Sequence, residues 1–225
     1  MKKLTIALVL LSFLGFNAQA DISVGLKVTS ANLQADGSET QNSGALVTQK
    51  EREADFEIAS VFAEKGLDLG IVDLSLGVEI IPFEREVAVL GGGTGFDATI
   101  SVGNLVSAYI QPMLLSNGDA TLYIKAGYAT ADLEIDKISR QATATAVSTG
   151  AASDSASTDG AQTRDLEGPL YGIGVQIAMD NFVDSIRIEA TRHDFDKITY
   201  TNSNSKKLTA DAAMDSLSIG LVKSF

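Results

Sequence analysis

The chemistry available to this chain centres on its one histidine. His193 is followed directly by Asp194, and serines are frequent elsewhere in the sequence. A histidine oriented by a carboxylate can activate a serine, so the pair suggests a surface hydrolase or acyltransferase. However, adjacent residues of a strand point to opposite faces, and no serine motif accompanies the pair. We therefore expect no catalytic residue.

Two further segments contain residue types that bind ligands in other proteins. The run 91–95 is Gly-Gly-Gly-Thr-Gly, but no Gly-Lys-Ser/Thr follows it as in a phosphate-binding loop. Asp154 and Asp159 lie within 141–163, a stretch rich in Ala, Ser, Thr and Gly whose spacing matches no calcium loop. We interpret both segments as surface loops and expect no metal and no cofactor.

The first twenty residues have the three parts of a secretory signal peptide. Lys2 and Lys3 precede the apolar run 4–14, and Ala18-Gln19-Ala20 supplies the small residues of a cleavage site. The apolar run is too short for a comfortable membrane span. We predict a signal peptide over 1–20 and a mature chain of one domain over 21–225.

The composition excludes several classes of protein. The chain contains 17 Lys and Arg against 29 Asp and Glu, a formal charge of −12, which argues against nucleic acid as a partner. It contains no cysteine, so neither disulfides nor thiolate chemistry are available.

Amphipathic segments alternate with short and long connections along the mature chain. Strands are predicted over 21–30, 54–64, 73–83, 98–114, 120–131, 168–179, 184–194 and 214–225. Long loops are expected near 31–53, 84–97, 132–167 and 195–213. This pattern predicts an all-β fold, an eight-stranded antiparallel up-and-down transmembrane β-barrel with its long loops outside the cell.

Most predicted strands have one apolar face and one face of small or polar residues. The strand over 21–30 is an example, with Val24, Leu26 and Val28 on one face and Gly25 and Lys27 on the other. Apolar residues must face lipid in a membrane barrel. The strand over 54–64 is apolar on both faces, and its orientation stays open.

Five charged residues fall at strand positions that should face the lumen: Lys27, Glu79, Lys125, Arg187 and Glu189. The interior of an eight-stranded barrel is just wide enough for side chains to fill, and charges buried there must pair. We expect a structural plug. The alternative is a polar gate that passes small ions when the pairs exchange partners.

The last strand ends on an aromatic residue, with Leu217, Ile219 and Leu221 at alternate positions before Phe225. In this strand and in its architecture the chain resembles the small eight-stranded outer-membrane barrels, namely the OmpA-type transmembrane domain, OmpX and OmpW-like proteins. The resemblance implies the outer membrane of a Gram-negative bacterium, and recognition of these four residues by the barrel-assembly machinery and periplasmic chaperones. Lys223 departs from the pattern where an aromatic residue is common.

The expected function is that of a non-enzymatic outer-membrane barrel in envelope structure or surface interaction. A narrow, porin-like channel for small solutes or ions, as in OmpW-like barrels, is the first alternative, and a lipid-modifying enzyme is the second. Arg192 has outward parity at the same strand end as His193, where it is a candidate contact for lipopolysaccharide phosphate together with Arg140 and Lys197. The sequence does not indicate a surface ligand.

Overall fold

The computed structural model of the chain describes residues 22–40, 46–70, 72–82, 84–90, 96–136, 138–140, 158–159, 162–180, 182–201 and 207–225. The predicted signal peptide, the glycine run 91–95 and most of 141–163 lie outside these residues. Among the described residues, no helix is long and apolar enough to cross a membrane.

The secondary structure of the described residues is β-strand. The strands are β1 (Ile22–Thr40), β2 (Leu46–Asp68), β3 (Asp73–Ile81), β4 (Arg85–Leu90), β5 (Phe96–Ser116), β6 (Ala120–Ile135), β7 (Ile138–Arg140), β8 (Thr158–Asp159), β9 (Gln162–Ala178), β10 (Ser185–Thr201) and β11 (Lys207–Ser224).

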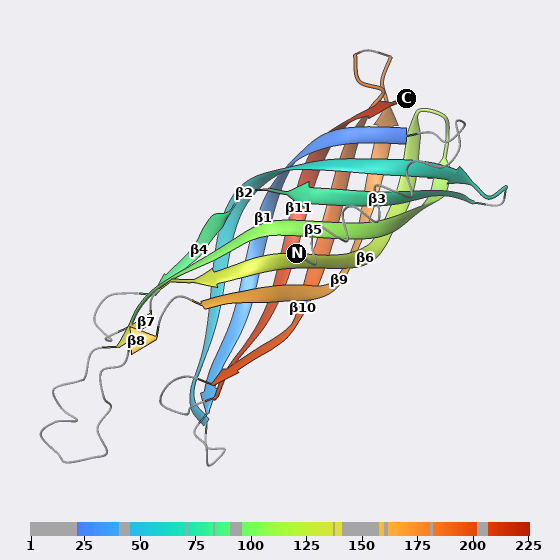
Figure 1. Cartoon of the computed structure of the whole chain (residues 1–225). Coiled ribbons are helices and arrows are strands. Elements are labelled where there is room, and N and C mark those ends of the chain that lie inside the picture. Colours follow the sequence, from blue (N-terminus) through green and yellow to red (C-terminus); the bar gives the residue numbers. More distant parts are fainter. Residues whose placement is uncertain are drawn as a thin grey trace, which may run out of the picture.

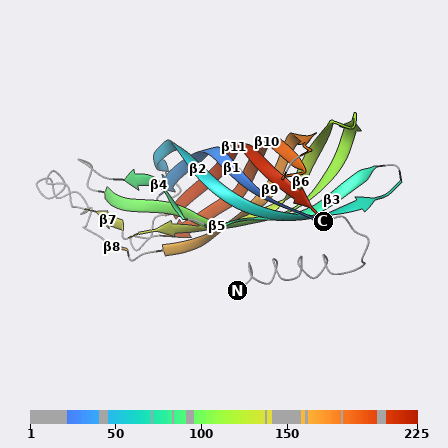
Figure 2. The same ribbon diagram turned by 90° about the horizontal axis from the view of Figure 1, so that it is seen from above.

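The long strands pair in an antiparallel ring. The order β3-β2-β1-β11-β10-β9-β6-β5 closes because β3 also pairs with β5. β4 continues the path of β3 along β5, and β7 and β8 extend the sheet beyond β5. The predicted eight-stranded up-and-down barrel is therefore confirmed (Figures 1 and 2).

Three predicted long loops are largely strand, so their boundaries were wrong. β1 continues to Thr40 and β2 begins at Leu46 within the predicted loop 31–53. β4 and the start of β5 lie within 84–97, and β10 and β11 extend into 195–213. These stretches are rich in Asn, Asp, Gly and Ser, which favour turns locally. Pairing with distant strands overrides that preference, as in the register Asp36 to Asp211.

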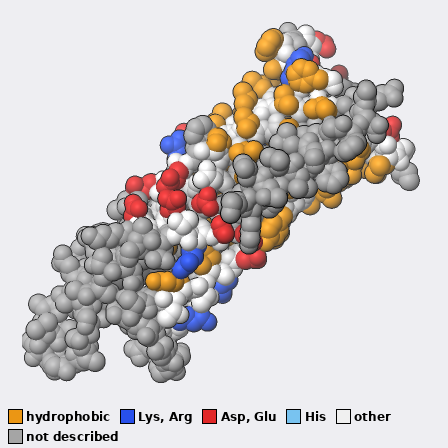
Figure 3. Space-filling view, viewed as in Figure 1, with side chains coloured by type: hydrophobic (Ala, Val, Ile, Leu, Met, Phe, Trp, Pro, Cys, Tyr) orange, Lys and Arg blue, Asp and Glu red, His pale blue; other side chains and the backbone are white. Residues whose placement is uncertain are grey.

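An apolar band surrounds the half of the barrel that contains the short turns. Its exposed side chains alternate with buried polar ones along most strands, as Leu26 and Lys27 do on β1. Figure 3 shows these apolar side chains gathered over this half, with acidic side chains beyond them. The exposed members include Val24, Leu26, Val28, Val61, Ile110, Ile124, Ile173, Ile188, Leu217, Ile219 and Leu221. Such a band is the lipid-facing surface of a membrane barrel.

The structure decides the orientation of β2 that the sequence left open. Phe62 and Ile58 are buried inside the barrel, whereas Val61 is exposed. On β3, Val78 shares the parity of the lipid-facing positions but is only 8% exposed.

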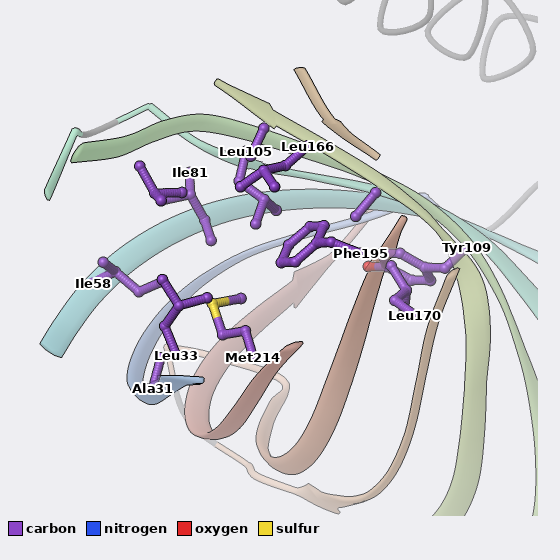
Figure 4. Packing of buried hydrophobic residues seen from close by; sticks show 13 residues of the cluster. Ala31, Leu33, Ile58, Ile81, Leu105, Tyr109, Leu166, Leu170, Phe195 and Met214 are labelled. Carbon is purple, nitrogen blue, oxygen red and sulfur yellow. The ribbon is translucent and has the colours of Figure 1, made fainter. Parts of the chain in front are cut away.

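Beyond the band, toward the long connections, the two faces of the strands exchange character. Apolar side chains point inward and pack together there (Figure 4). Asp55, Glu57 and Asp196 are exposed on the outer face. The buried cluster contains Ala31, Leu33, Ile58, Ile81, Val102, Leu105, Tyr109, Ala129, Ala131, Leu166, Leu170, Phe195 and Met214. This part of the barrel is built like a water-soluble β-protein, with an apolar core and a polar surface.

The ring also separates into two sheets in this region. The β9–β10 ladder ends at the pair Leu170 and His193, and the β2–β3 ladder ends at Val61 and Ile80. From there β2, β1, β11 and β10 continue as one sheet and β4, β5, β6 and β9 as another, and their ends diverge in Figure 1. We call these two sheets with their shared apolar cluster the extracellular extension, on the expectation from the sequence that the long connections lie outside the cell.

Candidate functional site

The lumen charges come from separate strands whose alternation turns them inward. Lys27 lies on β1, Glu79 on β3, Lys125 on β6, and Arg187 and Glu189 on β10, and all five are buried. Successive side chains of a β-strand point to opposite faces. This two-residue alternation turns all five side chains into the lumen. The structure brings all five together in the middle of the barrel.

Two lysines and two glutamates form the layer nearer the extracellular extension, which we call the upper charge layer. The Lys27 amine donates hydrogen bonds of 2.8 Å to both Glu79 and Glu189. The Lys125 amine lies 2.7 Å from the Glu189 carboxylate and 3.8 Å from that of Glu79. Ser60 donates a further hydrogen bond of 2.6 Å to Glu79. The formal charges of this layer sum to zero.

The lower charge layer, nearer the short turns, contains a residue that the sequence reading missed. Arg187 donates two hydrogen bonds to Glu64 on β2, of 2.7 and 2.9 Å, and one of 2.8 Å to Gln176. Tyr109 donates a hydrogen bond of 2.7 Å to the same carboxylate. Arg187 and Glu64 form a forked, charge-assisted pair, which is the strongest type of protein ion pair.

A signal for Glu64 was present in the sequence. The five predicted lumen charges comprise three cations and two carboxylates, an imbalance that a filled interior does not tolerate. A third carboxylate had to come from a strand whose orientation was open. With Phe62 turned inward, Glu64 on the same face of β2 completes the balance.

Aromatic rings connect the two layers. The Lys125 amine lies 4.0 Å from the centre of the Tyr109 ring, and the Arg187 guanidinium lies 5.2 Å from that of Tyr123. Tyr123 also donates a hydrogen bond of 3.0 Å to Glu189. Each tyrosine lies over a glycine, Tyr109 over Gly77 and Tyr123 over Gly174, where an added Cβ would overlap the ring. Both glycines leave the room that lets a large ring lie flat against the barrel wall.

His193 and Asp194 are not brought together. The His193 ring is buried inside the barrel and stacks on Phe195 with the ring centres 6.0 Å apart. Asp194 lies on the outer face, where it accepts hydrogen bonds of 2.6 Å from Tyr171 and 2.8 Å from Arg192. The opposite orientation of neighbouring strand residues therefore separates the pair, and the histidine has no carboxylate orienting it in this arrangement.

The candidate lipopolysaccharide contacts are placed as follows. Arg192 lies on the outer face just beyond the apolar band, but Asp194 and Asp215 both bind its guanidinium. Lys197 lies 3.6 Å from Asp211. Arg140 pairs with Phe96 through the backbone, and its side chain lies outside the described residues. Two of the three cations are thus already paired with carboxylates.

The residues of the predicted assembly signal lie on the lipid-facing side of β11. Leu217, Ile219 and Leu221 are exposed there, as is Phe225 at the end of the chain. Lys223, which departs from the family pattern, donates a hydrogen bond of 2.8 Å to Asp184 in the turn before β10.

The described residues contain no group of three or more His, Cys, Asp and Glu side chains arranged to hold a metal ion. A small cavity of about 20 Å³ lies between the upper charge layer and the apolar cluster, lined on one side by Lys27, Glu79 and Glu189 and on the other by Leu105 and Met214. It is far smaller than the volume of a site for a drug-sized ligand.

Known structures share this architecture. The outer-membrane protease OmpT from Escherichia coli matches with a TM-score of 0.51 at 10% sequence identity, covering 93% of this chain and 99% of that chain. The chain has the fold of an outer-membrane β-barrel. This likeness concerns the fold alone, so the protease activity of OmpT is not transferred. The predicted resemblance to small outer-membrane barrels is confirmed at the level of fold, and such barrels belong to the Gram-negative outer membrane.

Two smaller barrels also match, at lower structural similarity. The attachment invasion locus protein Ail of Yersinia pestis matches with a TM-score of 0.39 at 11% identity, covering 90% of this chain and 98% of that chain. Neisserial surface protein A matches with a TM-score of 0.38 at 13% identity, covering 91% and 97%. No family model and no curated protein matches the sequence.

The barrel's interior can pair and immobilise charge, and it has the geometry of a plug. Each of the three cations contacts a carboxylate within 2.8 Å, so none is presented to a passing solute. Charges held in this way stabilise one arrangement of the lumen side chains, and breaking one pair leaves an uncompensated buried charge.

Proposed function

We propose that this protein is a non-enzymatic outer-membrane barrel that contributes to envelope structure and surface interaction. The observation that supports this most is the filled interior. Two charge layers, each formally neutral, are followed by a packed apolar cluster, so the described side chains occupy the lumen from the lower charge layer to the extracellular extension. A filled lumen is the default for eight strands.

The extracellular extension gives such a barrel a rigid surface for interaction. Its two sheets are joined by buried side chains, and its outer face presents carboxylates such as Asp36, Glu53 and Asp55. This face suits a cationic or divalent-cation-bridged partner better than an anionic one. We therefore propose lipopolysaccharide as a neighbour of the barrel in the membrane and not as the partner of this acidic face. Two aspartates already bind the guanidinium of Arg192.

Conductance in planar lipid bilayers tests the proposal. The purified barrel should insert without producing discrete conductance steps in 1 M salt, whereas a matched preparation of a known porin produces them. Reproducible steps from the wild-type barrel, lost in a preparation unfolded before insertion, would favour the narrow channel instead. Insertion is verified independently by the slower gel migration of the heated sample.

The enzymatic alternative has its own test. Phospholipid and lipopolysaccharide from cells that express the wild-type barrel should match those from cells that express His193→Ala. The burial of His193, with Asp194 on the opposite face of β10, supports this expectation. A lipid modification that requires the wild-type histidine would overturn the non-enzymatic assignment.

A further inference from the structure

We infer that the cavity above the upper charge layer is a binding site for a single water molecule, which connects His193 to the charge layer. The inference rests on the size of the cavity, the charge of its lining and an unpartnered histidine nitrogen. It concerns the interior alone and stands whether or not the barrel conducts.

The size of the cavity suits one water molecule. Its volume is about 20 Å³. A water molecule needs at least about 10 to 15 Å³, so the space admits one and excludes a hydrated ion or an organic ligand.

The charge of the lining selects a neutral occupant. Lys27 and Lys125 are balanced by Glu79 and Glu189, and all four line the cavity. A bare cation or anion would disturb ion pairs that are already matched, at a high desolvation cost. A dipolar molecule that both donates and accepts hydrogen bonds fits this surface.

His193 supplies the unsatisfied group. It is 7% exposed, it lines the cavity, and its Nδ1 atom has no hydrogen-bond partner among the described groups. A buried polar atom without a partner is unfavourable, because it has lost its hydrogen bonds to water. Ser107, and the hydrogen-bonded hydroxyls of Thr191 and Ser216, line the same cavity. One water therefore finds the several polar neighbours that buried waters require.

The opposing possibility is a dry cavity, because Ile58, Ile81, Leu105, Leu170 and Met214 form its other wall. Dry apolar cavities bind xenon, whereas a site occupied by a well-bonded water does not. This difference gives a direct test.

The experiment is crystallography of the wild-type barrel, with and without xenon pressure. We expect an ordered water within hydrogen-bond distance of His193 Nδ1 and no xenon in the cavity. A Leu166→Ala variant is the positive control, since Leu166 is buried in the same cluster but does not line the cavity, and its truncation should leave an apolar space that takes up xenon. Xenon in the wild-type cavity would overturn the inference.

A second variant tests the role of His193. In His193→Phe the ring that stacks on Phe195 is kept and the nitrogen is lost. The water peak should fall to less than half of its wild-type occupancy. An unchanged water peak in this variant would show that the charge layer alone binds the water and would overturn the assigned connection.

Discussion

At the scale of single residues, the Arg187–Glu64 pair should show strong energetic coupling. Both side chains are buried and share two hydrogen bonds. Arg187→Met or Glu64→Gln alone leaves a buried charge without its partner and should lower the free energy of unfolding by about 3 to 5 kcal/mol. The double variant should cost much less than the sum, as measured by urea unfolding in lipid vesicles.

The matched control for this cycle is the exposed pair Lys197–Asp211, whose atoms lie 3.6 Å apart. Removal of either member should change the free energy of unfolding by no more than about 1 kcal/mol. Additive effects at Arg187 and Glu64 would mean that the lower charge layer is not a coupled unit.

Gly77 should also be sensitive to substitution, because it leaves room for a ring that contacts the lumen charges. A Cβ at this residue would overlap the Tyr109 ring, whose hydroxyl group binds Glu64. Gly77→Ala should therefore lower the free energy of unfolding by about 1 to 3 kcal/mol, the usual cost of overpacking. Adding Tyr109→Leu should cost less than the two single changes together. Tolerance of Gly77→Ala with an unchanged near-ultraviolet spectrum would contradict this placement of the ring.

At the scale of the strand, β1 contains both environments of the barrel and allows a matched comparison. Leu26 is 62% exposed within the apolar band, whereas Ser38 lies on the same strand in the extracellular extension. Leu26→Arg should cost about 2 to 4 kcal/mol on folding into a bilayer, because the arginine would face the lipid interior. Ser38→Arg, facing water, should change the free energy within about 0.5 kcal/mol. Equal costs would mean that the apolar band does not meet lipid.

The same strand shows how far the sequence could lead. Alternation of Leu26 and Lys27 was enough to predict both the lipid face and the lumen face, because the two environments differ sharply in the membrane. Beyond the membrane that alternation reverses, with Leu33 inward and Asp36 outward. Such a stretch of short polar residues resembles a loop until its partners on β2 and β11 are known. Glu64 was missed for a related reason, since both faces of β2 are apolar at that point.

At the scale of the whole molecule, the barrel has two parts, one surrounded by lipid and one by water, and the placement of polar and apolar side chains is opposite in the two. In the membrane, polar groups fill the interior and apolar groups cover the surface, and in the extension the arrangement is the reverse. The charge layers lie within the membrane part, and the apolar cluster follows them directly. Substitution of an inward-facing residue therefore alters ion pairing in the membrane part of the barrel and core packing in the extracellular extension.

Closure of the barrel depends on the seam between the first and last strands, and Asp184, in the turn before β10, holds the end of the last strand. Phe225 donates its backbone hydrogen bond to Ile22 across the seam, at 2.8 Å. Asp184 accepts hydrogen bonds from the Lys223 amine and from the backbone of Ser224, at 2.8 and 2.6 Å. These bonds hold the pKa of the Asp184 carboxyl below its usual value. Because the folded pKa is depressed, the stabilisation is fully present above the unfolded value of about 3.9 and is lost as the pH falls through the folded pKa.

Asp184→Asn should remove this dependence on pH. Unfolding rates of the wild-type barrel and the variant in detergent, followed by the gel migration of unheated samples, should differ at pH 6 and converge as the pH falls through the depressed pKa of the folded Asp184 carboxyl. Other carboxylates titrate in both proteins, so the difference between the two curves isolates Asp184. Lys223→Met should reproduce part of the effect by removing one of the two donors. Two parallel curves down to the lowest pH would show that the end of β11 is held by its backbone pairing with β1 and β10 and not by the Asp184 side chain.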